Sequence, residues 1–203
     1  MVVVILDFET SGLNPYHDDI IENGAKILNS DNSFATLLKP KSNRPISKKI
    51  TDITGISNSD LRTGGKPWYI AYIEFYNWLY ESYQVDNSLV IVSHNGDSFD
   101  FVFLKRLLKD LLEKGVKNNI DLSKITWIDT LPLSKRLLPG RSFYNQPSLA
   151  RTYQVYIESA HRAMGDVIVL EQIYNHLMKE LNKTKINNIL DPENIRKYID
   201  LRL

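Results

Sequence analysis

Short apolar runs separated by polar turns dominate much of the chain. Apolar and β-branched residues fill residues 2–7, 20–28 and 33–38. These three runs predict strands that would pair as an antiparallel meander. Residues 89–92 and 125–130 are similar apolar runs further along. Both predict additional strands, and the first of them reads as fully buried.

Three longer segments repeat their apolar residues at helical spacing. They are residues 67–83, 99–113 and 163–181, and each predicts a helix with one face toward the core. Residues 39–66 lie between the third strand and the first of these helices and are rich in Pro, Gly, Ser, Thr and Asn. This composition predicts a long basic loop, with a short helix after Ser47.

Three sequential strands followed by strands that alternate with helices are typical of a mixed α/β sheet. We therefore expect one α/β domain over residues 1–181, with three antiparallel strands and then parallel strands in a central sheet flanked by helices. Residues 182–203 would form a C-terminal extension. There Asp191 as N-cap and Pro192 at the first helical position predict a short helix packed on the same domain.

Composition limits the class of protein. The chain has 203 residues, of which 43% are hydrophobic, and it has no cysteine. A chain of this size can bury a substantial core, and a disulfide framework is excluded. No apolar run approaches the roughly 20 residues of a transmembrane helix, and the first residues lack the pattern of a signal peptide. We expect an intracellular protein, cytoplasmic or nuclear, without a membrane partner.

Charge is distributed unevenly along the chain. The formal net charge is +1, which argues against a protein that coats nucleic acid by bulk electrostatics. Counted by segment, however, residues 1–35 carry −5, residues 36–66 carry +5, residues 67–99 carry −4 and residues 100–162 carry +5. An ordinary solvated surface explains such a pattern about as well as a polyanion-binding protein whose acids hold cations.

The first candidate site residues are Asp7 and Glu9, at the end of the first predicted strand. Residues two apart on a strand point to the same face, so these carboxylates would converge. Two carboxylates held close together repel each other unless a cation lies between them, which favours a divalent metal site. A polar strand end exposed to water is the alternative for this pair alone.

Two further acidic positions stand where predicted elements begin. Asp100 follows the strand at residues 89–92, and ligands collect at such strand ends, although Asp97 or Ser98 as a helix cap would explain the same sequence. Asp166 lies at the start of the last long helix, five residues after His161. A buried Asp on this largely apolar helix needs a partner.

Together these segments resemble the three motifs of the DnaQ-like 3′–5′ exonucleases of the DEDDh group. Asp7-Phe-Glu9-Thr-Ser-Gly-Leu13 resembles the first motif, residues 94–100 the second, and residues 160–167 the third. Ile53-Thr-Gly-Ile and Asp129-Thr-Leu resemble shorter family segments between them. The form of the second and third motifs is most similar to TREX-like exonucleases, whereas the Asp-Thr-Leu segment is closer to bacterial proofreading subunits. Asn23 departs from the family, where an aliphatic residue is usual.

The resemblance implies an RNase H-like fold and a metal-dependent hydrolase. Two divalent ions, Mg²⁺ with Mn²⁺ able to substitute, would be held by Asp7, Glu9, Asp100 and Asp166, a hard-cation donor set. His161 would act as general base for the attacking water. Thr10, Leu13 and Asn95 would contact the substrate, and His94 would organise the second motif by hydrogen bonding. Lysines and arginines of the basic segments could follow phosphates, with Phe143 or Tyr144 available for stacking.

Three functions remain open at this stage. The leading hypothesis is a 3′–5′ exonuclease that releases nucleoside 5′-monophosphates from single-stranded or frayed 3′ ends of DNA, in repair or proofreading. A 3′–5′ exoribonuclease similar to RNase T or oligoribonuclease is the alternative enzyme. A catalytically silent nucleic-acid-binding or polymerase-accessory module is the alternative from another class. The sequence does not decide whether the protein forms a homodimer or has a polymerase partner.

Overall fold

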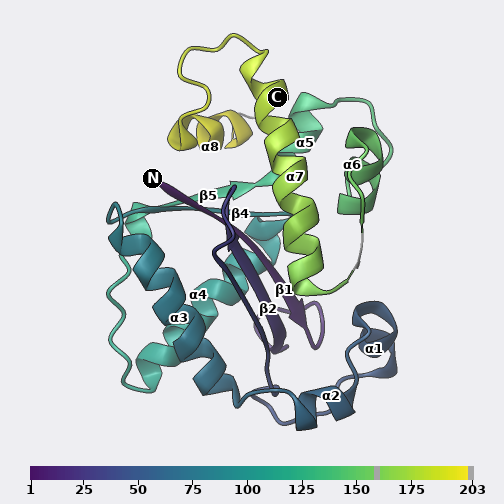
Figure 1. Ribbon diagram of the computed structural model, residues 1–203, viewed down its shortest axis with the longest axis vertical. Helices are drawn as coiled ribbons and strands as arrows, with labels where there is room; N and C mark the ends of the chain where they lie inside the picture. Colours follow the sequence, from purple (N-terminus) through teal and green to yellow (C-terminus); the bar gives the residue numbers. More distant parts are fainter. Residues whose placement is uncertain (158–160, 201–203) are drawn as a thin grey trace.

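The computed structural model describes residues 1–157 and 161–200. Its centre is a five-stranded mixed sheet in the order β3-β2-β1-β4-β5 (Figure 1). The strands are β1 (Val2–Thr10), β2 (Ile20–Ile27), β3 (Ser33–Leu37), β4 (Leu89–Ser93) and β5 (Ile125–Asp129). The first three pair antiparallel, and β4 and β5 continue the sheet in parallel with β1. The expected fold class is confirmed.

Eight α-helices surround the sheet in the described residues. They are α1 (Lys48–Thr54), α2 (Asn58–Thr63), α3 (Trp68–Gln84), α4 (Asp100–Glu113), α5 (Thr130–Leu137), α6 (Gln146–Tyr153), α7 (Ala163–Asn182) and α8 (Pro192–Asp200). Short 3₁₀ turns at Gly96–Ser98 (η1) and Leu122–Lys124 (η2) precede α4 and β5.

Helices α2, α5 and α6 differ from the prediction, and α2 lies in the part of residues 39–66 that was expected to be loop. Each of the three helices has only six to eight residues, too few for apolar periodicity to show. Residues that can cap a helix are a clearer sequence signal for short helices than apolar periodicity. Ser57 and Asp60 form a capping box at the start of α2, and Asn145 caps α6 through the Ser148 N–H.

The two faces of the sheet are covered by different helices. Val4, Leu6 and Phe8 of β1 point to the face packed by α3 and α4, whereas Ile5 points to the face packed by α7. Figure 1 shows α7 running along this second face, with its first turn near the end of β1. The alternation along β1 therefore sends Asp7 and Glu9 to the α7 face.

The last described helix, α8, packs on the same domain. Ile195 and Ile199 are buried with residues of β4, β5 and α7, and the Arg136 Nε of α5 donates to the Ile199 carbonyl over 3.1 Å. No helix in the described part of the chain is long and apolar enough to cross a membrane.

Candidate active site

The first two carboxylates of the site come from β1. Asp7 pairs with Gly24 of β2, and Glu9 pairs with Glu22. The period of two along the strand places Asp7 and Glu9 on one face, as the sequence analysis expected. The ladder shifts between Glu9 and Thr10, so the regular pairing of β1 and β2 ends at this point.

Asp166 reaches this pair because α7 approaches β2 very closely. A side chain at Gly24 would place its Cβ only 2.5 Å from the carbonyl carbon of Ala163, at the start of α7. Only glycine permits this approach. One turn into α7, a carboxylate oxygen of Asp166 lies within 4.8 Å of those of Asp7 and Glu9. The structure thus brings three of the four predicted acidic ligands together.

Asp100, the fourth predicted acid, is buried behind the others. The pairing of β1 with β4 ends at Ile5. Further along β1, the Phe8 N–H donates to Asp100 Oδ1 over 3.0 Å. The Ser93 hydroxyl donates to Asp100 Oδ2 over 2.5 Å. The capping alternative is wrong, because α4 begins at Asp100 and neither Asp97 nor Ser98 caps it.

Burial raises the pKa of every carboxylate in this cluster, and repulsion between carboxylates adds to the shift for Asp7 and Glu9. Burial raises the pKa of Asp7 well above its usual value, with repulsion from Asp100, Glu9 and Asp166 adding to the effect. Burial and the charges of Asp166, Glu22 and Asp100 raise the pKa of Glu9 to about 8. The pKa values of Asp100 and Asp166 are also raised, chiefly by burial. The cluster carries more negative charge than its protein surroundings neutralise.

Glu22 and Arg162, which the sequence analysis did not assign, anchor the segment that carries His161. The Arg162 guanidinium donates from Nε to both Glu22 oxygens over 3.1 Å, and the Ala163 N–H donates to Glu22 Oε2 over 2.9 Å. A glutamate directly after Ile20 and Ile21, inside a predicted strand, was the signal available in the sequence.

His161 itself lies at the edge of the cluster. Its backbone has a positive φ of 60°, which is uncommon for a residue other than glycine. Its N–H donates to Asp166 Oδ2 over 3.1 Å, and its side chain is exposed. Ala160, the first residue of the third motif, lies outside the described residues.

A network around Asp129 shapes the turn between β4 and α4. Its carboxylate accepts the N–H groups of Asn95 and Asp97 over 2.9 and 3.1 Å. The His94 Nδ1 lies 2.9 Å from the Thr130 hydroxyl, consistent with the expected organising role of His94. The sequence analysis noted Asp129 only as part of a family segment, and its contacts show that it holds the second motif in place.

The expected substrate contacts have different surroundings. Thr10 is buried, and its hydroxyl donates to the Gly12 carbonyl over 2.6 Å. Leu13 is 81% exposed on the loop that follows β1. Asn95 is exposed in a left-handed conformation at the start of the turn. The structure thus places Leu13 and Asn95 on the surface beside the segments that carry the acids.

The chain is similar to short segments of much longer DNA polymerases. A DNA polymerase III PolC-type from Thermotoga petrophila is 33% identical over 205 residues, which cover 97% of this chain and 13% of the polymerase. The corresponding protein of Ureaplasma parvum is 31% identical over 92% of this chain and 12% of its own length. The chain therefore spans a small part of these relatives.

Solved structures share the fold at low sequence identity. Exonuclease I of E. coli, in a complex with single-stranded DNA, superposes with a TM-score of 0.66 at 18% identity, over 94% of this chain and 42% of that one. Cell-death related nuclease 4 superposes with a TM-score of 0.65 at 22% identity, over 88% of this chain and 64% of that one.

A family profile described as exonuclease, RNase_T, matches residues 4–174, from β1 into α7. This range includes all three motifs. The expectation of a hydrolase of the 3′–5′ exonuclease class is confirmed at the level of the family. The chain therefore belongs to the exonuclease family, as a DnaQ-like domain of the DEDDh group with an RNase H-like fold.

Proposed function

We propose that this chain removes nucleotides one at a time from the 3′ end of single-stranded or frayed DNA and releases nucleoside 5′-monophosphates. The convergence of Asp7, Glu9 and Asp166 within 4.8 Å carries the proposal. These three carboxylates, with the buried Asp100 near them, form an acidic centre at the end of β1. The nearby Arg162 guanidinium is engaged by Glu22.

The donor set fits the divalent metals on which the exonuclease family depends. Every donor is a carboxylate oxygen, which hard cations such as Mg²⁺ and Mn²⁺ prefer. The raised pKa values of Asp7 and Glu9 fit as well, because a bound cation would favour the ionised carboxylates against the burial and the repulsion that raise these values. Asp7, Glu9 and Asp166 would hold one ion, and Asp7 and Asp100 a second. When bound, the ions stabilise the negative charge that develops on the phosphodiester oxygens.

His161 takes the proton of the attacking water in this proposal. An imidazole nitrogen can accept a proton from water, and the exposed side chain of His161 can return that proton to solvent. Its backbone is positioned by the hydrogen bond from its N–H to Asp166, and the next residue, Arg162, is tied to Glu22. Glu22 and Arg162 are therefore positioning residues for His161.

Three residues outside the carboxylate cluster would bind the terminal nucleotides. Leu13 projects its apolar side chain into solvent, where it can wedge against the terminal base. The Thr10 hydroxyl is occupied by its hydrogen bond to the Gly12 carbonyl. The backbone groups of Thr10, and not its side chain, would therefore contact the 3′ sugar. Asn95 offers an exposed amide at the opposite side, held by the Asp129 bond to its N–H.

The comparisons support DNA over RNA as substrate. The relatives are DNA polymerases of the PolC type, and one structural neighbour was solved with single-stranded DNA. A domain that resembles part of a polymerase fits a proofreading setting, in which frayed 3′ ends are the substrate. A polymerase partner belongs to this proposal.

The test is hydrolysis of 5′-labelled oligonucleotides in Mg²⁺ or Mn²⁺. We expect a ladder shortened from the 3′ end, with 5′-monophosphates as products and single-stranded DNA consumed faster than RNA. Asp7→Asn and Asp166→Asn should abolish it, whereas Asp31→Asn, a change of an exposed acid outside the site, should not. RNA consumed much faster than DNA would indicate an exoribonuclease instead. No hydrolysis with either metal would favour a silent binding module.

A further inference from the structure

The loop between β1 and β2, residues 11–19, presents a large aromatic side chain to solvent. Tyr16 is 75% exposed, although the backbone of the loop is firmly held. Leu13 on the same loop was expected from sequence to meet the substrate, but Tyr16 was assigned no role. Single exposed apolar side chains are common on protein surfaces, so a role for Tyr16 depends on what holds and surrounds it.

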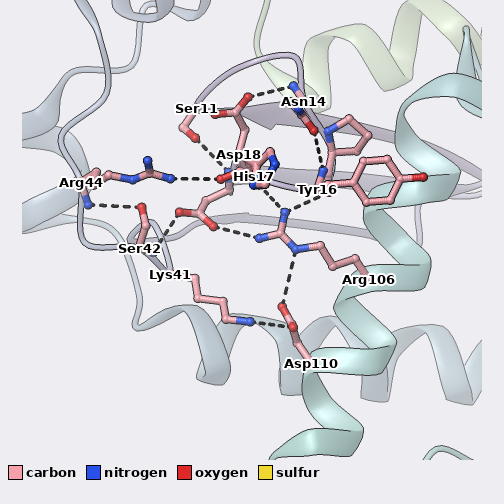
Figure 2. Close-up of polar contacts among 12 residues, drawn as sticks. Ser11, Asn14, Tyr16, His17, Asp18, Lys41, Ser42, Arg44, Arg106 and Asp110 are labelled. Carbon is pink, nitrogen blue, oxygen red and sulfur yellow. Dashed lines mark hydrogen bonds and ion pairs between the residues drawn. The ribbon is translucent and has the colours of Figure 1, made fainter.

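Arg106 of α4 holds this loop from beneath (Figure 2). Its Nη1 donates to the carbonyls of Pro15 and Asp18 over 2.9 and 2.6 Å, and its Nη2 donates to Asp19 Oδ1 over 3.1 Å. Asp19 is buried, and its other oxygen accepts the Ser42 N–H over 2.9 Å. One guanidinium thus joins the loop to α4.

Bonds within the loop complete the support. Ser11 and Asp19 are joined twice, by the Ser11 N–H to the Asp19 carbonyl over 2.8 Å and by the Asp19 N–H to the Ser11 hydroxyl over 2.9 Å. The Asn14 N–H donates to Asp18 Oδ2 over 2.8 Å, and the Tyr16 N–H donates to Asn14 Oδ1 over 3.0 Å. Figure 2 shows the Tyr16 ring pointing away from this network. Hydrogen bonds of the loop therefore fix the position of Tyr16, and its ring takes part in none of them.

The ring borders an open groove of about 480 Å³ along α4. The lining residues are Pro15, Tyr16, Val102, Lys105, Arg106, Lys109, Asp110 and Glu113. Lys105 and Lys109 are one helical turn apart and both exposed. Lys109 has only a 3.8 Å contact with the exposed Glu113, and such a surface pair is weak. Asp110 is neutralised by Lys41 at 2.6 Å.

The groove follows α4 from Val102 to Glu113. α4 begins at Asp100, whose carboxylate lies against β1. From Asp100 to Lys109 the helix rises about 13 Å, enough for roughly four stacked nucleotides at about 3.4 Å each. Asp7 and Glu9 face α7, whereas α4 packs on the other face of the sheet, so a strand whose 3′ end lies at the carboxylates would pass the end of β1 to reach this groove.

We propose that Tyr16 is a stacking platform for a base upstream of the 3′ terminus, and that Lys105 and Lys109 contact the phosphates of the same single strand. Stacking on an aromatic ring tolerates any base, and pairing it with lysines is a general way to hold single strands. A rigid loop makes the ring effective, because little conformational entropy is lost on binding.

Two aromatic residues were suggested for stacking from the sequence, and Phe143 is 68% exposed, so it keeps that role as a prediction. Tyr144 fits the role less well. Tyr144 is partly buried, and its hydroxyl donates to the Leu138 carbonyl over 2.7 Å. It braces the segment between α5 and α6. Tyr16 has the exposure, the rigidity and the neighbouring cations that a stacking residue needs.

The inference rests on the proposed function and is tested by substrate length. For a thymidine oligomer of roughly ten nucleotides, Tyr16→Ala should raise KM about tenfold with little change in kcat. Hydrolysis of a dinucleotide, too short to reach the groove, should be unaffected. Tyr16→Phe should keep the wild-type KM because it keeps the ring. Tyr156→Ala, which removes a comparably exposed ring elsewhere, is the control.

The lysines are tested by salt. Lys109→Gln should reduce the slope of log KM for the oligomer against log salt concentration by about 0.7. Lys179→Gln on α7 should leave this slope unchanged. Equal KM values for wild type and Tyr16→Ala at both lengths, with wild type active, would overturn the stacking subsite and leave the proposed function intact. A wild-type protein that hydrolyses neither substrate would overturn both.

Discussion

Replacing Glu9 by Gln should stabilise the metal-free protein at neutral pH while abolishing its activity. Burial and the charges of Asp166, Glu22 and Asp100 raise the pKa of Glu9 from 4.5 to about 8. In the unfolded chain Glu9 has its ordinary pKa, so between about pH 4.5 and pH 8 the folded protein binds one more proton than the unfolded chain. The free energy of unfolding therefore falls as pH rises through this window.

The size of the effect follows from the proton count. One proton of difference changes the free energy of unfolding by about 1.4 kcal/mol per pH unit, or about 2 kcal/mol between about pH 6 and pH 7.5. Glu9 is partly exposed, so solvent screening reduces this to about 1–2 kcal/mol. Glutamine cannot ionise, and Glu9→Gln should lose this part of the pH dependence.

Urea unfolding in the presence of EDTA measures the effect directly. Wild type and Glu9→Gln are compared near pH 6 and near pH 7.5, with Glu81→Gln on the exposed side of α3 as the matched control. The stability advantage of Glu9→Gln should grow with pH, whereas Glu81→Gln should follow wild type. Parallel pH profiles for wild type and Glu9→Gln would refute the reasoning.

Mg²⁺ gives an independent check on the same protein. Because protons and the cation compete for the carboxylates, Mg²⁺ should stabilise wild type more near pH 7.5 than near pH 6. In Glu9→Gln the Mg²⁺ effect should be smaller at both values, since one donor has lost its charge. An equal Mg²⁺ effect in the two proteins would place the cation elsewhere.

Three further changes test other parts of the structure. Asn23→Leu should raise the free energy of unfolding measured with urea by about 1–2 kcal/mol, because the buried Asn23 amide has no hydrogen-bond partner among the described residues. A lower free energy of unfolding would show that the amide is hydrogen-bonded. Gly24→Ala should reduce kcat about tenfold or more in a folded protein, because its Cβ would displace Ala163 and with it α7; unchanged kcat would contradict the close approach. Arg196→Met should lower the free energy of unfolding by about 1 kcal/mol, because it removes the two hydrogen bonds to Asp97, 2.9 and 3.0 Å long. Arg196→Lys should restore part of this free energy, and unchanged thermal melting in both variants would mean that the Arg196–Asp97 pair does not stabilise the fold.

Periodicity along the chain was sufficient for much of the fold. The period of two in β1 follows from the pleat of a strand, so it placed Asp7 and Glu9 on one face without any tertiary information. The long helices α3, α4 and α7 carry enough turns for their apolar faces to be visible. The short helices α2, α5 and α6 were not predicted, because about two turns contain too few apolar positions.

The family motifs named residues that local patterns could not join. Asp7 and Asp166 are separated by most of the chain, and their resemblance to known motifs was the reason to place them together. Glu22, Gly24 and Asp129 were missed, because each supports the site through contacts with a distant segment. Glu22 anchors Arg162, and Asp129 holds the Asn95 turn.

The sequence by itself determined the strands and the long helices, the class of sheet and the residue types of a hard-cation site. These depend on local spacing and on the chemistry of single side chains. Only the tertiary structure decided that α7 comes within reach of Gly24, that Glu22 faces Glu9, and that the Tyr16 loop is fastened to Arg106. The physical reason is that long-range approach depends on the packing of all layers at once, which no local window of sequence contains.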